Sequence, residues 1–159
     1  MAELTGRKAS DSMTEQRQLI EAQHINNIQT LFGGQLMSWM DVIAGAAGRL
    51  HAGRHVTMVA VDDMQITAPA YLGETLILKA RVTNAGRTSL EILVEVEIEG
   101  EDKTIRPMSK AFFIAVVLDD EGHSAPAPPL ITETEEERKL WEDAEKRKEL
   151  RKQRRAMQI

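Results

Sequence analysis

The chain contains no cysteine, which excludes disulfide bonds and thiolate chemistry and leaves the redox compartment unmarked. No apolar run approaches the roughly 20 residues that a helix needs to cross a bilayer. The segment from Met1 to Leu19 also lacks the hydrophobic core of a secretion signal. We therefore expect a cytoplasmic protein without a membrane partner.

The sequence also has no excess of positively charged residues. The 159 residues carry a formal net charge of −5 and a pI of about 5.4, so the overall charge does not indicate a nucleic-acid partner. Metal-ligand spacing is equally scarce. Of the four histidines only His51 and His55 are spaced i, i+4, and Gly53 between them is typical of a helix end. We predict no metal site and no separate cofactor.

The most informative segment runs from Ile25 to Gly48, where Asp41 is the only charged residue. Apolar residues after the Gly33–Gly34 pair recur at helical spacing, which predicts a helix over about 34–51. Apolar and small residues also surround Asp41 on the adjacent face. We therefore expect a buried helix with no exposed side.

A lone acid on such a helix has two interpretations. Burying an unpaired carboxylate costs several kcal/mol, so a chain avoids it unless the group is paired or used. Asp41 can be a structural residue that is hydrogen-bonded to a neighbouring strand. Alternatively, it can be a general base or a nucleophile. Composition alone leaves both interpretations open.

The region around and after this helix alternates between apolar and polar residues. The pattern predicts a weak edge strand and four further strands, over 12–20, 55–67, 74–83, 89–97 and 104–118. We expect irregularities at Asp62–Asp63 and near Pro107, and a hairpin turn in which Gly86 has positive φ. A long helix followed by antiparallel strands indicates an α+β fold in which the sheet curls around the helix.

Composition divides the chain into a domain over 10–120, a Pro-rich linker over 121–131 and a charged helix over 132–159. In that helix the acids come first and the bases last, an order that suits the helix dipole. One interpretation is a solvated helix that packs on the domain through apolar residues, namely Leu140, Trp141, Ala144 and Leu150. The other is that its basic end binds a phosphorylated ligand or RNA.

Several motifs occur in a specific order. The sequence N-x-x-x-x-LFGG-x-LM-x-WMD spans Asn26 to Asp41, and it is followed by Val56-Thr57, by Asp63 with Pro69, by Gly73-Glu74 and by GRTS at Gly86–Ser89. Together these motifs resemble the hot-dog-fold acyl-CoA thioesterases, in the cytosolic acyl-CoA hydrolase branch. The charged terminal segment resembles that of bacterial members. Two places depart from the family: Gln29 stands where many members have glycine, and Ile66 and Thr67 stand where an aromatic residue is common.

The resemblance implies a long helix inside a curled antiparallel sheet, and hydrolysis of fatty acyl-CoA to free CoA and fatty acid. CoA would be part of the substrate rather than a cofactor. It implies that Asp41 is the base or nucleophile and that the thioester is engaged by Asn26 and by the amides of Gly33 and Gly34. We expect Thr57 or Ser38 to lie beside the carboxylate.

Geometry adds a constraint on assembly. Gly34 and Asp41 are about 10 Å apart along a helix, so one copy cannot bring both to the same carbonyl group. We therefore predict a homodimer in which each copy supplies half of a site, and the resemblance suggests a trimer of such dimers, a hexamer. The phosphates of CoA should attract cations and polar groups, and the candidates are Arg87, Thr88, Ser89, Arg54, Lys110 and Arg81.

Other functions stay open at this stage. A module of the same fold could sense or bind acyl-CoA without cleaving it. A dehydratase of this fold would need a catalytic histidine near the helix start, where His24 is the only candidate.

Overall fold

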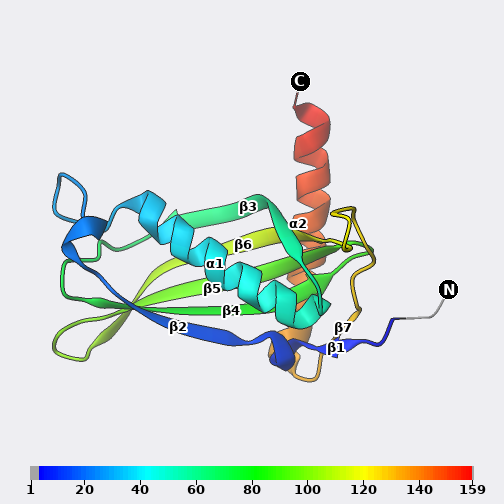
Figure 1. The fold of residues 1–159 in the computed structure, drawn as a ribbon, viewed down its shortest axis with the longest axis horizontal. Helices are drawn as coiled ribbons and strands as arrows, with labels where there is room; N and C mark the ends of the chain where they lie inside the picture. The colour runs from blue at the N-terminus through cyan, green and yellow to red at the C-terminus, as the bar shows by residue number, and fades with distance from the viewer. Residues whose placement is uncertain (1–3, 159) are drawn as a thin grey trace.

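A computed structural model describes residues 4–158, and Ile159, the last residue of the predicted charged segment, lies outside this range. The centre of the fold is a five-stranded antiparallel sheet that curls along one side of helix α1 (Gly33–Ala52) (Figure 1). The strands follow the order β2-β4-β5-β6-β3, with bounds Thr14–Leu19, Thr75–Ala85, Ser89–Glu99, Ile105–Val117 and Val56–Ile66. This arrangement confirms the predicted α+β hot-dog fold.

Shorter elements surround this sheet. Strand β1 (Arg7–Lys8) pairs in parallel with β7 (Leu130–Ile131), so the segment before η1 and the segment before α2 lie side by side. The 3₁₀ helices η1 and η2 span Ala9–Ser12 and Ala22–His24. The charged helix α2 spans Glu135–Met157. Within residues 4–158, no helix combines the length and apolarity needed to cross a membrane.

The hydrophobic core lies between α1 and the inner face of the sheet. Side chains on α1 at helical spacing are fully buried, and Leu36, Met40, Ile43 and Ala47 are among them. They meet alternate residues of the central strands, such as Leu90, Ile92 and Val94 of β5. The predicted helical and strand periodicities therefore describe this interface correctly.

The predicted irregularities are also present. In β3 the register with β6 shifts between Asp62 and Gln65, and Asp63 adopts a left-handed φ of 53°. In β6 the register shifts opposite Glu97, next to Pro107. Proline has no N–H to give to the ladder, so the pairing is interrupted there.

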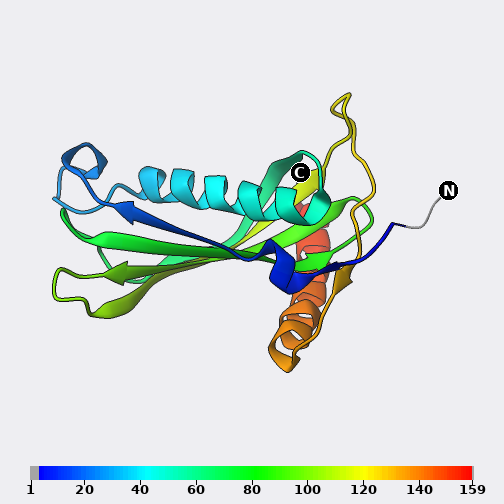
Figure 2. The ribbon, with the colours of Figure 1, turned by 60° about the horizontal axis from the view of Figure 1, so that its bottom comes forward.

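One prediction about α1 is wrong for the single chain. Its other face is exposed: Met37, Val42 and Leu50 keep 45%, 60% and 53% of their accessible surface, and Asp41 is exposed as well. The reason is that the sheet covers only one side of the helix (Figure 2). An apolar sequence shows that a face avoids water, but it does not show whether the same chain covers that face.

The prediction for Gly86 is wrong too. Among the described residues, left-handed φ values occur at three glycines, Gly53, Gly73 and Gly122, and not at Gly86. The hairpin closes with a bond from the Gly86 N–H to the Ser89 carbonyl oxygen at 2.8 Å. A Cβ at position 86 would lie 3.0 Å from Ser89 Oγ and 3.3 Å from Lys148 Nζ. A side chain at position 86 would therefore have to displace the Ser89 hydroxyl and the Lys148 ammonium group slightly, and φ gives no reason for glycine there.

Helix α2 packs on the outer face of the sheet, near the end where α1 finishes (Figures 1 and 2). Thr134 and Glu137 form a reciprocal capping box at its start. Ala144 is buried as predicted, but Leu150 is 55% exposed and Trp141 is 38% exposed. The apolar contact predicted for this helix is therefore small, and most of its attachment is ionic.

Candidate active site

The loop before α1 is organised by Asn26. Its Oδ1 accepts bonds from the backbone N–H groups of Ile28 and Thr30 at 3.1 and 3.0 Å, and its Nδ2 donates to Thr30 Oγ1 at 3.0 Å. Gln29 inside this loop has a left-handed φ of 64°, a conformation that glycine adopts more readily than other residues. Asn26 therefore has a structural role in its own loop, and its contact with a thioester stays a prediction.

The loop leads into the start of α1, where the first backbone N–H groups are unpaired. The Phe32 carbonyl oxygen accepts from the N–H groups of Gln35 and Leu36. The N–H groups of Gly33 and Gly34 have no acceptor within the described chain, and Phe32 offers no capping side chain. Because the N-terminal end of a helix is electropositive, two free amides here suit an anionic oxygen.

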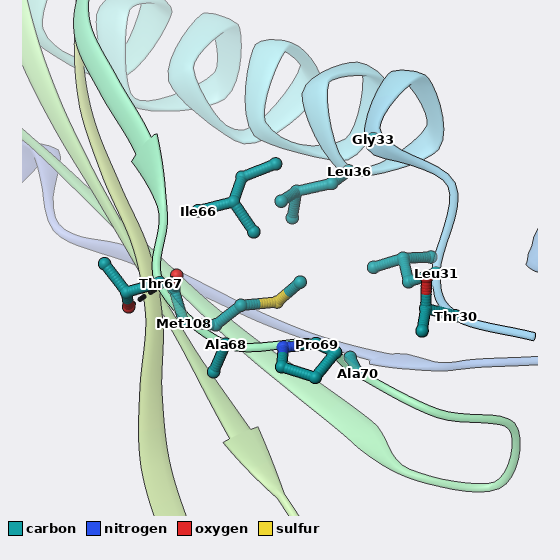
Figure 3. A pocket seen from close by; sticks show the side chains of 10 residues that line it. All are labelled: Thr30, Leu31, Gly33, Leu36, Ile66, Thr67, Ala68, Pro69, Ala70 and Met108. Carbon is teal, nitrogen blue, oxygen red and sulfur yellow. Dashed lines mark hydrogen bonds between the residues drawn. The ribbon is translucent and has the colours of Figure 1, made fainter. Parts of the chain in front are cut away.

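A cavity of about 280 Å³ opens beside Gly33, between the start of α1 and the end of β3. Ile66, Met108 and Leu36 point into it (Figure 3). Its wall exposes polar and apolar atoms in about equal shares and is completed by Thr30, Leu31, Thr67, Ala68, Pro69 and Ala70. Ile66 and Thr67, the two residues that depart from the family pattern, therefore both line this cavity.

Asp41 lies on the exposed face of α1, two turns after Gly34. Its carboxylate makes no hydrogen bond and no ion pair within residues 4–158. Ser38 and Thr57 are also exposed, and neither is hydrogen-bonded to Asp41 in the single chain. The helix keeps Asp41 about 10 Å from the free amides, so one chain holds the two halves of a site apart.

The residues predicted to contact CoA are brought together only in part. Thr88 and Ser89 line a second hollow, of about 600 Å³, between α2 and the outer face of the sheet. Arg87 is exposed in the neighbouring turn, and Arg54 follows α1. Lys110 lies outside this hollow, 5.6 Å from the centre of the Phe112 ring. Arg81 is paired with Glu136 at 2.8 Å and is not free.

The same hollow is lined by cations of α2, which the sequence analysis treated only together, as the basic end of the charged helix. They are Lys148, Arg151, Lys152, Arg154 and Arg155. The run of bases identified the basic end of the helix. It could not show that this end lies over Thr88 and Ser89, because docking of α2 on the sheet depends on contacts far apart in the sequence.

The His24 ring packs edge-on against Trp39, with centroids 4.7 Å apart, and its Nδ1 accepts the Glu21 N–H at 3.0 Å. The only histidine that a dehydratase could use near the helix start thus has a capping role.

Over residues 4–158, no three His, Asp or Glu side chains gather in a way that could hold a metal ion.

Comparison with known proteins places this geometry in a family. Residues 28–105 match the model of the thioesterase superfamily. The Bacillus subtilis (strain 168) protein named uncharacterized acyl-CoA thioester hydrolase YkhA is 35% identical over 130 residues, which cover 81% of this chain and 76% of that protein. The mouse acyl-coenzyme A thioesterase 11 is longer, and the chain spans 24% of its length.

Solved structures agree in fold. An apo-hexameric acyl-CoA thioesterase superposes with a TM-score of 0.93 and 31% identity, covering 98% of this chain and 100% of that one. The acyl-CoA hydrolase of Staphylococcus aureus, solved with butyryl coenzyme A, coenzyme A and coenzyme A disulfide, gives 0.88 and 30%, covering 95% and 93%. Variants of that hydrolase are also solved, with an aspartate, an asparagine or a threonine replaced by alanine. The chain therefore belongs to the thioesterase superfamily and, within it, to the hot-dog-fold acyl-CoA thioester hydrolases.

Proposed function

We propose that this chain hydrolyses fatty acyl-CoA to free CoA and a fatty acid. The observation that carries the proposal is the unpaired Asp41 carboxylate on a helix whose first amides, at Gly33 and Gly34, are also unpaired. One group can accept a proton, and the others can stabilise a negative oxygen. Ester hydrolysis needs both at a single carbonyl group.

The chemistry follows from these roles. The Gly33 and Gly34 amides bind the thioester oxygen, and each such donor typically lowers the barrier by about 3 kcal/mol. Asp41 takes a proton from water, and the resulting hydroxide adds to the carbonyl carbon. The C–S bond then breaks, the fatty acid forms, and the CoA thiolate takes up a proton. Direct attack by Asp41 would instead form an acyl-enzyme anhydride, which water cleaves.

Neighbouring residues support this site. One N–H of the Asn26 amide group bonds Thr30, and the other is available to the thioester oxygen or to the water. The aspartate and asparagine replaced in the Staphylococcus enzyme are separated by the same interval as Asp41 and Asn26. The threonine replaced there stands one residue further from the aspartate than Thr57 does here. Ser38 or Thr57 would orient the carboxylate.

The site requires a second copy of the chain. Because Asp41 lies about 10 Å from the amides of its own helix, the amides at one carbonyl group come from one subunit and the carboxylate from the other. The exposed apolar residues beside Asp41, including Met37 and Val42, would be covered by that subunit. Related structures are described as hexameric. We propose a dimer as the minimal unit, three dimers as the assembly, and a cytoplasmic location.

The test is the Asp41→Asn substitution, with CoA release measured by thiol detection across a series of acyl lengths. We expect kcat to fall at least about hundredfold, since proton transfer is lost, while CoA binding and the mass of the assembly stay unchanged. Full turnover by this variant would overturn the role of Asp41. A wild-type protein that binds acyl-CoA and releases no thiol would instead be an acyl-CoA sensor.

A further inference from the structure

The cavity beside Gly33 adjoins the free amides at the start of α1. Its volume of about 280 Å³ lies at the lower end of the roughly 300–1,000 Å³ that small-molecule pockets span. Gly33 lines it, and the Gly33 N–H has no acceptor within the described chain. A group bound at these amides therefore has this cavity next to it. We call the space lined by Gly33 and the nine residues drawn with it in Figure 3 the α1 cavity.

The polar side chains of the α1 cavity are already bonded. Among the described residues, none of the side chains that line it is charged. Thr30 Oγ1 accepts from Asn26 Nδ2 at 3.0 Å. Thr67 Oγ1 donates to the Met108 carbonyl oxygen at 3.1 Å. Because no cation or anion faces the cavity and both hydroxyl groups are in use, a charged ligand would be desolvated there without a partner.

The cavity has an exposed rim and a buried wall. Ile66 keeps 51% of its accessible surface, whereas Met108 keeps 2%. Both side chains, together with Leu36, point into the same space (Figure 3). A Cβ on Gly33 would lie 3.9 Å from Ile66 Cδ1, so Ile66 reaches the start of α1. The rim at Ile66 is therefore the side nearest the free amides, and Met108 forms the buried wall on the sheet.

The buried wall has a fixed backbone and an adaptable side chain. The Met108 carbonyl oxygen accepts both the N–H and the hydroxyl of Thr67, at 2.8 and 3.1 Å, and these bonds tie β6 to the chain just after β3. The methionine side chain has three rotatable bonds and a polarizable sulfur, which suit it to filling irregular space. The depth of the cavity is therefore set by one side chain, and a substitution at that position changes it.

Size and wall together indicate the occupant. A methylene group is about as large as a water molecule, whose share of the liquid is about 30 Å³, so the cavity has room for fewer than about nine such groups. Pockets for long apolar ligands are lined mainly by apolar atoms, but here polar and apolar atoms are exposed in about equal shares. A short acyl group with its polar thioester at one end matches both properties.

We propose that the α1 cavity holds the acyl chain and that Met108 limits its length, so that short and medium acyl groups are the preferred substrates. This inference rests on the proposed function, because it takes the Gly33 and Gly34 amides to bind the thioester oxygen. With the oxygen held there, the first carbons of the chain pass Ile66 and the last ones reach Met108. A longer chain must leave the cavity or displace the Met108 side chain. Ile66 and Met108 are thus specificity residues, and neither acts in the bond-breaking step.

The experiment compares two cavity variants with a matched control. Met108→Ala deepens the cavity, and Ile66→Phe narrows it at a half-exposed position that the fold should tolerate. The control, Ile92→Ala, also removes a buried apolar side chain, but at the other end of the core, where Ile92 Cδ1 lies 3.1 Å from the position of a Cβ on Gly48. For each assembled protein, kcat/KM is measured with saturated acyl-CoA substrates from acetyl to palmitoyl.

We expect kcat/KM of the wild type to rise about three- to fourfold per methylene while the chain fills the cavity, and to stop rising before about nine carbons. Met108→Ala should raise the decanoyl-to-butyryl ratio of kcat/KM at least about tenfold, since it adds room for about two to three more carbons. Ile66→Phe should shift the best substrate to a shorter chain. The control should keep the ratio within about twofold of the wild type.

Three results would overturn the inference. One is a wild type that prefers palmitoyl-CoA. Another is an unchanged best substrate in both cavity variants, and Ile66→Phe decides alone if Met108→Ala does not fold. The third is an equal shift in Ile92→Ala, which would show that the length profile responds to any loss of core packing.

The proposed function is judged separately, through acyl-CoA thioethers that cannot be hydrolysed. Their binding to the wild type, measured by calorimetry, should show the same limit on chain length. Binding with that limit but no thiol release from any thioester would exclude the hydrolase and leave the acyl cavity supported. Thiol release with no limit on length would support the hydrolase and exclude the role of Met108.

Discussion

The two long helices of this chain are held in opposite ways. Helix α1 carries two formally charged residues, Asp41 and Arg49, and packs through apolar side chains against the inner face of the sheet. Helix α2 is dominated by charge, buries little more than Ala144, and is held by ion pairs on the outer face. The helix with few charges leaves its carboxylate and its first amides unpaired, whereas the charged helix pairs the carboxylates it covers.

This difference separates structure from function. Glu91 keeps 3% of its side-chain surface, and it is bonded by Arg147, by Arg151 and by Thr83 Oγ1. A buried charge left alone would cost several kcal/mol, so the fold supplies it with partners. Asp41 has no partner within residues 4–158, which is what the proposed role at a second molecule's carbonyl group would require. Unpaired polar groups on an apolar helix therefore indicate the site better than the charges of α2 do.

The largest effect that tests this contrast is on stability. Replacing Glu91 by alanine leaves Arg147 mostly buried without a carboxylate, whereas Arg151 keeps Asp62, so we expect the free energy of unfolding to fall by about 3–5 kcal/mol. Asp41→Ala should change it by less than about 0.5 kcal/mol, since no bond within the chain is lost. Urea unfolding of both variants measures the difference.

A conservative variant refines that test. Glu91→Gln keeps the volume and one acceptor oxygen, so it should cost less than Glu91→Ala. If Asp41→Ala proved as destabilising as Glu91→Ala, Asp41 would be a structural residue, and the contrast between the two helices would disappear.

A smaller effect is expected on rate at the start of α1. A Cβ at Gly34 would lie 2.5 Å from Phe32 Cε1, so Gly34→Ala must move the ring or the backbone that presents the free amides. We expect kcat to fall by about ten- to a hundredfold, because an oxyanion donor is displaced, while the helix itself tolerates alanine well.

The neighbouring glycine provides a comparison. A Cβ at Gly33 would meet nothing nearer than Ile66 Cδ1 at 3.9 Å, which is an ordinary contact. Gly33→Ala should therefore lower kcat less than Gly34→Ala does. The opposite order would show that the amides are not positioned through Phe32.

Much of the fold could be predicted because its signals are local. The apolar period of α1, the alternation along the strands and the interruption at Asp62–Asp63 depend on residues a few positions apart. The pairing of β1 with β7, and of α2 with the sheet, could not be predicted. Arg154 and Asp62 are distant in sequence, and nothing beside either residue identifies the other.

The residues of the candidate site could be proposed from local signals to a similar extent, and their roles stay predictions. A lone acid in an apolar segment led to Asp41, and the glycine pair led to the free amides. The exposed face of α1 was missed because an apolar residue gives the same pattern whether its own sheet or a second chain covers it. The position of Lys148 beside the turn at Gly86 was missed because α2 reaches that turn only once it is docked on the sheet.

A third prediction concerns acid and the attachment of α2. Burial raises the pKa of the Asp62 carboxyl, but hydrogen bonds and charges from Arg154 and Arg151 outweigh burial, so the net shift is downward. A carboxyl with a lowered pKa contributes stability above its unfolded pKa of about 4, and this is lost as the pH falls through the folded value. We expect a loss of about 1.5 kcal/mol, given that Arg154 is half exposed.

The control for this prediction is Asp62→Asn, which cannot titrate. Its unfolding free energy should be lower than that of the wild type at pH 7, and the two curves should converge as the pH falls below about 4. Urea unfolding across that range provides the measurement. Curves that remain parallel would exclude Asp62 as a source of the acid sensitivity.

The smallest effect is expected at the far end of α1, where His51 is bonded through only one of its two ring nitrogens. His51 is fully buried, and its Nε2 lies 2.8 Å from the carbonyl oxygen of Pro128. A carbonyl only accepts, so Nε2 carries the proton, and Nδ1 is buried without a partner within the described residues. Burial lowers the pKa of His51, the bond to Pro128 raises it, and Arg7 and Asp11 make smaller opposing contributions.

The net shift of the His51 pKa is downward, so the folded protein binds fewer protons than the unfolded chain just below pH 6.5. The free energy of unfolding must therefore decrease as the pH is lowered through this range. We expect a loss of about 1 kcal/mol between pH 7 and pH 5.5, a window in which most carboxylates stay ionised. The His51→Gln variant keeps a donor for Pro128 and cannot be protonated, so its unfolding free energy should be flatter over that window. An equal slope in both proteins would mean that His51 exchanges no proton on unfolding. Protonation of the unpaired His51 Nδ1 would then make no contribution to the pH dependence of the unfolding free energy in that range.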